Sequence, residues 1–150
     1  MSLLQKTWGK VAVVLGVLVM CMTLVLSGFV LSRFTTVQPG SIECKNQSIA
    51  WGENMIASVV MGRTGLESLA ELDTSAARMY FDRAEKMLGE NSPPSCNQNL
   101  VIAHMDTVQA FALLQEVADD VDSGQMSQVG EKLNEAVRLF KHAGSLVDNE

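Results

Sequence analysis

The sequence is poor in the residue types that build β-sheets. Aromatic side chains make up 5% of the 150 residues, whereas Ala, Leu, Val and Met are abundant. Such a composition favours helices packed through aliphatic side chains over a sandwich of sheets. No stretch alternates long enough to require a strand, and no repeat of about 20 to 50 residues is present. We therefore expect an all-α fold.

Motifs that hold metals, cofactors or nucleophiles are also missing. The only two histidines, His104 and His142, do not form a ligand-spaced pair, and the nine methionines do not cluster. The segment from Asp120 to Glu131 places acids at positions 1, 3 and 12 of an EF-hand loop, but Gln125 stands where that loop needs glycine. We expect no catalytic centre, no cofactor and no metal site.

Basic residues are absent from a long internal segment. There is no Lys or Arg between Lys86 and Lys132, while acidic side chains recur there. The chain beyond residue 33 carries 8 basic and 17 acidic side chains, a net charge of −9, which argues against binding nucleic acid. An ordinary solvated surface and a docking face for a basic partner are the two interpretations. The predicted acidic docking face consists of Glu116, Asp119, Asp120 and Asp122.

Residues 11–32 form a long apolar segment without Lys, Arg, Asp or Glu. These 22 residues contain no ionisable acid or base, and as a helix they would cover about 33 Å, enough to cross a membrane. A cleaved signal peptide has a shorter apolar region and a small-x-small cleavage site, so we expect a retained signal anchor, with cleavage as the alternative. Lys6 and Lys10 precede the span, which predicts that residues 1–10 are cytoplasmic.

Small residues recur within the predicted span. Ala12 and Gly16 form one small-xxx-small pair, and Gly28 and Ser32 form another. Such pairs let a second helix approach closely. They predict a transmembrane helix contact.

Beyond the span, residues 33–46 read as a linker broken by Pro39-Gly40, and residues 47–150 as an extracytoplasmic bundle of about four antiparallel helices. Gly124 is a predicted helix terminator and Ser127 a predicted N-cap. Thr64 and Glu67 have the spacing of a capping box. The alternative division places the break at Asp73 or Thr74. The expected helices are 47–61, 64–89, 99–122 and 126–148.

The three cysteines fit this layout. Cys21 lies in the span, Cys44 precedes the first expected helix and Cys96 precedes the third. In an antiparallel bundle the starts of the first and third helices lie at the same end, so a Cys44–Cys96 disulfide is expected. Two free thiols or a bond to another chain are the alternatives.

Two polar residues fall within the apolar surface of the third expected helix. His104 and Gln115 are 11 residues apart, about three turns. They are predicted to form a buried polar pair, serving either packing or a small-ligand pocket.

These features predict a protein of the cell (inner) membrane, single-pass, with its bundle in the periplasm. The first hypothesis is a non-enzymatic accessory or structural subunit that contacts the bilayer and another membrane or periplasmic protein, one with a basic face if the acidic face is used. The alternative is a small-ligand-sensing input module acting through a partner protein. An elongated spacer is disfavoured by the short, apolar helices.

Overall fold

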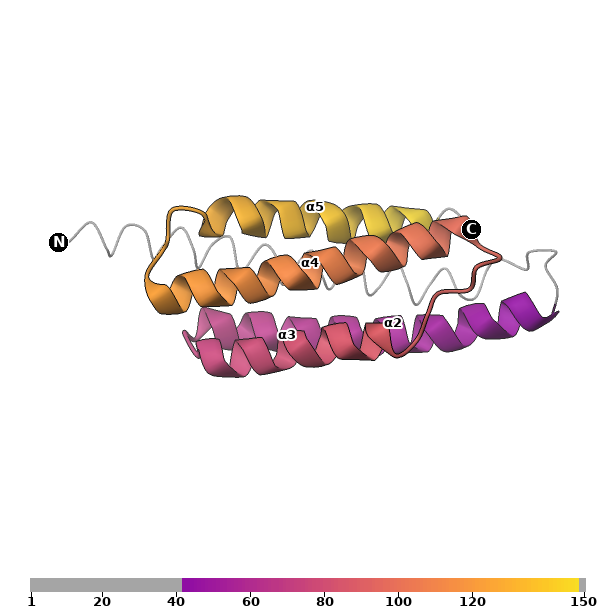
Figure 1. Ribbon diagram of the computed structural model, residues 1–150, viewed down its shortest axis with the longest axis horizontal. Coiled ribbons are helices and arrows are strands. Elements are labelled where there is room, and N and C mark those ends of the chain that lie inside the picture. The colour runs from indigo at the N-terminus through magenta and orange to yellow at the C-terminus, as the bar shows by residue number, and fades with distance from the viewer. Residues whose placement is uncertain (1–41, 149–150) are drawn as a thin grey trace.

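The computed structural model describes residues 42–148, and these form helices without strands. The helices run antiparallel in sequence order, as an all-α bundle (Figure 1). The predicted span 11–32, its small-residue pairs Ala12/Gly16 and Gly28/Ser32, and most of the predicted linker lie outside the described residues. Within 42–148 no helix combines the length and apolarity needed to cross a membrane. The helices are α2 (Ile42–Ala70), α3 (Thr74–Gly89), α4 (Gln98–Ser123) and α5 (Val129–Asp148).

The helices form two hairpins. The first consists of α2 and α3, the second of α4 and α5, and the hairpins are joined chiefly where α3 packs along α4 (Figure 1). A narrower contact links α2 to α4, whereas α5 approaches α4 alone among the described helices. The helix α4 is therefore central, as its broad apolar surface suggests.

The break between the first two helices differs from the expected one. Helix α2 runs without interruption through Gly62 and Gly65, so the predicted division into 47–61 and 64–89 is wrong. The alternative break is correct: Leu72 adopts φ 65°, and the Asp73 carboxylate caps α3 by accepting from the Ala76 backbone N–H at 2.9 Å. Thr64 caps nothing, because its hydroxyl donates to the Val60 carbonyl in the preceding turn.

The two glycines inside α2 are packing residues. A Cβ on Gly62 would lie 2.8 Å from Phe111 Cζ, and a Cβ on Gly65 would lie 2.8 Å from Phe81 Cδ1. Each glycine thus lets an aromatic ring from α4 or α3 rest against the α2 backbone. Tertiary packing outweighs the low helix propensity of glycine here.

The second hairpin lies close to its predicted bounds. Helix α4 spans 98–123, against an expected 99–122, and begins at Asn97, whose side chain accepts from the backbone N–H groups of Asn99 and Leu100. Gly124 ends it in the left-handed conformation, φ 75°. Helix α5 begins at Val129, so Ser127 lies in the turn and is not the N-cap.

The start of the bundle also differs from expectation. Residues 42–46 were predicted to belong to the linker but are helical, which places Cys44 inside the first turn of α2. The core contains two aromatic rings in contact, Phe111 and Phe140, with centroids 5.3 Å apart in an edge-to-face arrangement. The largest fully buried side chains are Phe81, Phe111, Leu66, Leu69, Leu88, Leu114, Leu133, Val117 and Val129.

Candidate functional site

The predicted disulfide is present and closes one end of the bundle. Cys44 in α2 is bonded to Cys96 in the loop that leads into α4, with their Cα atoms 6.2 Å apart. As expected, the starts of α2 and α4 lie at the same end, on the right in Figure 1. The bond ties the first hairpin to the second across 52 residues of sequence.

A tryptophan–histidine contact lies next to this end and joins the same two helices. The indole Nε1–H of Trp51 on α2 donates to Nδ1 of His104 on α4 at 3.2 Å. Their ring centroids are 6.4 Å apart, and Trp51 is 3% exposed. Burial lowers the pKa of His104, since the charged imidazolium is poorly solvated there.

The predicted pairing of His104 with Gln115 is wrong. Gln115 lies three turns further along α4, and its amide donates to Glu85 of α3 at 2.8 Å. Each residue therefore has its own partner on a different neighbouring helix. The 11-residue spacing places two side chains along one face of a helix but does not bring them together.

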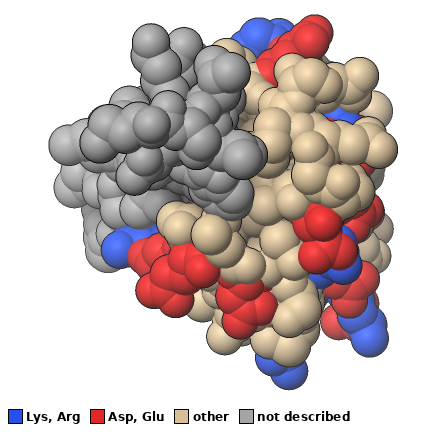
Figure 2. Space-filling model, turned by 90° about the vertical axis from the view of Figure 1, so that its left-hand side faces the viewer, with Lys and Arg blue, Asp and Glu red and all other residues tan. Residues whose placement is uncertain are grey.

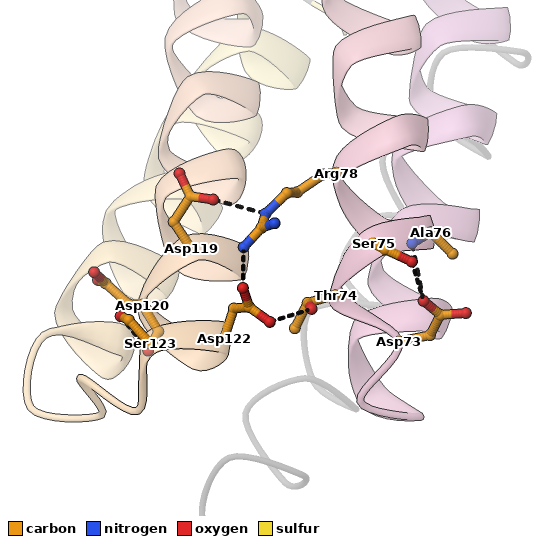
Figure 3. Close-up of polar contacts among 9 residues, drawn as sticks. All are labelled: Asp73, Thr74, Ser75, Ala76, Arg78, Asp119, Asp120, Asp122 and Ser123. Atoms are coloured by element: carbon orange, nitrogen blue, oxygen red, sulfur yellow. Dashed lines mark hydrogen bonds and ion pairs between the residues drawn. The ribbon is translucent and has the colours of Figure 1, made fainter.

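The opposite end of the bundle carries the predicted acidic face, and two basic residues form ion pairs with its four carboxylates. Arg78 of α3 lies between two carboxylates of α4: its Nε is 2.7 Å from Asp119 Oδ1 and its Nη2 is 2.9 Å from Asp122 Oδ2 (Figure 3). The Asp122 contact is an aligned hydrogen bond, while that with Asp119 is an ion pair only. Thr74 also donates to Asp122, at 3.0 Å.

The other two residues of the acidic face, Glu116 and Asp120, pair with a lysine of α5. Lys132 of α5 lies 2.7 Å from Asp120 and 3.1 Å from Glu116. Hydrogen bonding to Asp120 and then to Glu116 raises the pKa of Lys132, and hydrogen bonding to Arg78 lowers the pKa of Asp122. Both shifts favour the charged forms.

All four residues of the predicted acidic face thus form ion pairs within the chain. Figure 2 views this end, and on its described part acidic and basic side chains lie next to each other. The interpretation as an open face awaiting a basic partner overlooked Arg78 and Lys132, which come from α3 and α5. A further pair, His142 with Asp106 at 2.6 Å, joins α4 and α5 and has no signature in the sequence.

An apolar row on the outside of α2 was also missed. Ile42, Ile49, Ile56 and Val60 follow one another at spacings of 7, 7 and 4 residues, which places them on one side of the helix. Ile42 is 81% exposed, Ile49 43% and Val60 47%, while Ile56 is partly buried. We call these four residues the outer α2 row. The opposite face of α2 is apolar too, with Trp51 and other core residues, so helical periodicity alone could not distinguish the two faces.

Between α3 and α4 there is an open depression of about 410 Å³. It is lined by Asp82, Glu85, Lys86, Gly89 and Val108. Its openness to solvent makes it unlike the enclosed, largely apolar sites that hold small molecules. Within residues 42–148, no group of three or more His, Cys, Asp or Glu side chains is arranged to hold a metal ion.

The geometry thus comprises a disulfide-linked end with the Trp51–His104 contact, an ion-paired end, and the outer α2 row. Comparison of the chain with protein-family models, with curated proteins and with solved structures finds no match.

Proposed function

We propose that the protein is a non-enzymatic, membrane-anchored accessory subunit, and that its bundle binds another membrane protein through the outer α2 row. The proposal combines the predicted span at residues 11–32 with the exposed apolar side chains of α2. The observation that carries it is the row itself: Ile42, Ile49 and Val60 are exposed on the side of α2 that points away from the core, where they alternate with polar residues such as Lys45 and Glu53.

An apolar side chain on a helix surface is ordinary, but a row of them is not. Helices of soluble domains normally set a polar face opposite the apolar one, so isoleucine and valine side chains that recur along the outer face are a candidate contact surface. Ile42 and Val60 lie 18 residues apart, about 27 Å along the helix axis. The row is therefore long enough to receive one helix of a partner lying alongside.

The position of the row in the chain indicates the partner's class. Ile42 follows the predicted span by ten residues, so the row would begin close to the membrane surface. An integral membrane protein whose apolar helix extends out of the bilayer would meet it at that height. A basic partner at the other end of the bundle would have to compete with Arg78 and Lys132 for the acidic side chains, so we assign the docking to the row.

Site-specific photo-crosslinking tests the proposal. A photoreactive amino acid at position 60 should crosslink to an integral membrane protein in intact cells, whereas one at position 79 should not. Met79 is the matched control, because it is an apolar α3 residue exposed to 50%, close to the 47% of Val60. Val60→Glu should abolish co-purification of the same partner in mild detergent, and Met79→Glu should preserve it.

Other outcomes would overturn the assignment. Crosslinking only to a second copy of the chain would make the row a homodimer contact, and no crosslink at position 60 would remove its support. Co-purification that survives Val60→Glu would place the partner elsewhere. Recovery of a lone monomer with a bound metabolite would favour the sensing alternative.

A further inference from the structure

The hydrogen bond between Trp51 and His104 can run in one direction only. An indole N–H can only donate a hydrogen bond, so the histidine atom facing it must accept. Nδ1 of His104 is that atom, at 3.2 Å from Trp51 Nε1. Acceptance requires an unprotonated Nδ1, and hence a neutral imidazole.

Protonation of His104 would replace this acceptor with a second donor. Two N–H groups would then face each other, and the indole of Trp51, which is 3% exposed, would lose the acceptor His104 provides. The contact belongs to the α2–α4 interface, which is narrower than the other helix interfaces of residues 42–148. Losing it removes a larger share of the contact there than it would elsewhere.

Within residues 42–148, no ion pair joins a carboxylate to His104, and the charged side chains Asp82 and Glu85 on α3 line the depression beside Val108. On α2, one turn either side of Trp51, stand Ser48 and Met55; Cys44 is in the disulfide and does not titrate. On α4, one turn either side of His104, stand Leu100 and Val108. The charged groups of neighbouring elements are engaged elsewhere or line the depression: Asp106 of α4 pairs with His142 of α5, Glu85 of α3 accepts from Gln115, and Lys86 lines the depression. Burial is the cause that lowers the pKa of His104.

We propose that the Trp51–His104 contact is a pH-sensitive latch between α2 and α4, closed at neutral pH and opened when mild acid protonates the imidazole. The latch lies at the disulfide end, so the Cys44–Cys96 bond keeps the two helices tethered while the packing beyond it loosens. This proposal does not depend on the identity of any partner.

Fluorescence of Trp51 provides the first test. The chain has two tryptophans, so Trp8→Phe in the full chain, in mild detergent, leaves Trp51 as the only tryptophan, which is excited selectively at a wavelength where Tyr80 does not absorb. Its emission should change as the pH falls below the ordinary histidine value of 6.5. His104→Gln, which retains an acceptor but does not titrate, should abolish the change, and the matched variant His142→Gln should preserve it. A change that persists in His104→Gln, or one lost in His142→Gln, would overturn the latch.

A direct titration covers the case in which His104→Gln does not fold. In His142→Gln, His104 is the only histidine, so its ring proton signals report its titration by NMR. The midpoint should lie below 6.5 and coincide with the fluorescence change, each unit of difference meaning a tenfold preference of the folded chain for the neutral ring. Amide exchange along α2 should accelerate over the same range. A midpoint at or above 6.5, or exchange that is insensitive to this pH range, would refute the proposal.

Discussion

Gly62 offers the sharpest test of how the bundle is packed. In an exposed helix interior, replacing glycine by alanine stabilises a protein by about 1 kcal/mol, because alanine is the better helix former. At Gly62 the added Cβ would lie 2.8 Å from Phe111 Cζ and closer still to Cε1, a ring held in the core by Phe140. Overpacking of this kind costs about 1–3 kcal/mol. Because the contact with Cε1 is this short, the cost should lie in the upper part of that range, about 2–3 kcal/mol. We therefore expect Gly62→Ala to destabilise the fold by about 1–2 kcal/mol once the propensity gain of about 1 kcal/mol is subtracted.

Gly130 is the matched control for this substitution. It also lies within a helix, α5, but a Cβ there would meet nothing within 4 Å. Gly130→Ala should therefore stabilise the fold by about 0.5–1 kcal/mol. The two variants should move in opposite directions in urea unfolding followed by far-ultraviolet circular dichroism.

A double variant separates the steric cost from other causes. Phe111→Leu creates space opposite Gly62, so Gly62→Ala combined with Phe111→Leu should lose less stability than the sum of the two single changes. If Gly62→Ala is as stable as the parent protein, or if the two losses simply add, then Phe111 does not rest on the α2 backbone as described.

The remaining predictions concern the two ends of the bundle. Replacing both Cys44 and Cys96 by serine should lower the free energy of unfolding by about 4 kcal/mol, from the loop entropy of the 52-residue separation; a loss below about 1 kcal/mol in urea unfolding would contradict that reasoning. The pKa values of Asp73, through the Ala76 N–H, and of Asp122, through Arg78, are lowered, so their contribution to stability is complete above the ordinary value of 3.8 and is lost as the pH falls through the lowered values. Asp73→Asn keeps a capping side chain but removes its titration, so acid unfolding of this variant should depend less steeply on pH, and an unchanged slope would count against the assignment.

The second hairpin could be predicted closely because its signals are local. Asn97 and Gly124 mark the ends of α4 through their own side chain or backbone conformation. The disulfide followed from topology, since only the order of helices is needed to bring Cys44 and Cys96 to one end.

The break in the first hairpin was predicted in the wrong place because a glycine can mark either the end of a helix or a close contact between helices. Gly62 and Gly65 flank the capping-box residue Thr64, where the break was predicted, but each glycine faces an aromatic ring from another helix. The residues next to these glycines in the sequence do not indicate a contact with Phe81 or Phe111. The actual break lies at Asp73, the N-cap of α3, which was predicted only as the alternative.

The ion pairs of the acidic face could not be predicted for a similar reason, because their basic partners come from other helices. Residues 87–131 contain no Lys or Arg, so the sequence suggests an uncompensated acidic surface on α4. Arg78 and Lys132 lie just outside that segment and reach α4 from both neighbouring helices. The Trp51–His104 contact, 53 residues apart in sequence, was likewise beyond local reasoning.

The ends of the bundle are held by different chemistry, so they answer to different conditions. A reductant acts on the covalent tie at one end and leaves the ion pairs alone, whereas high salt screens the exposed ion pairs of Arg78 and leaves the covalent tie intact. We therefore expect a reductant to loosen one end of the bundle and high salt to loosen the other. The described helices would then show two separable partial openings, one caused by reductant and the other by high salt.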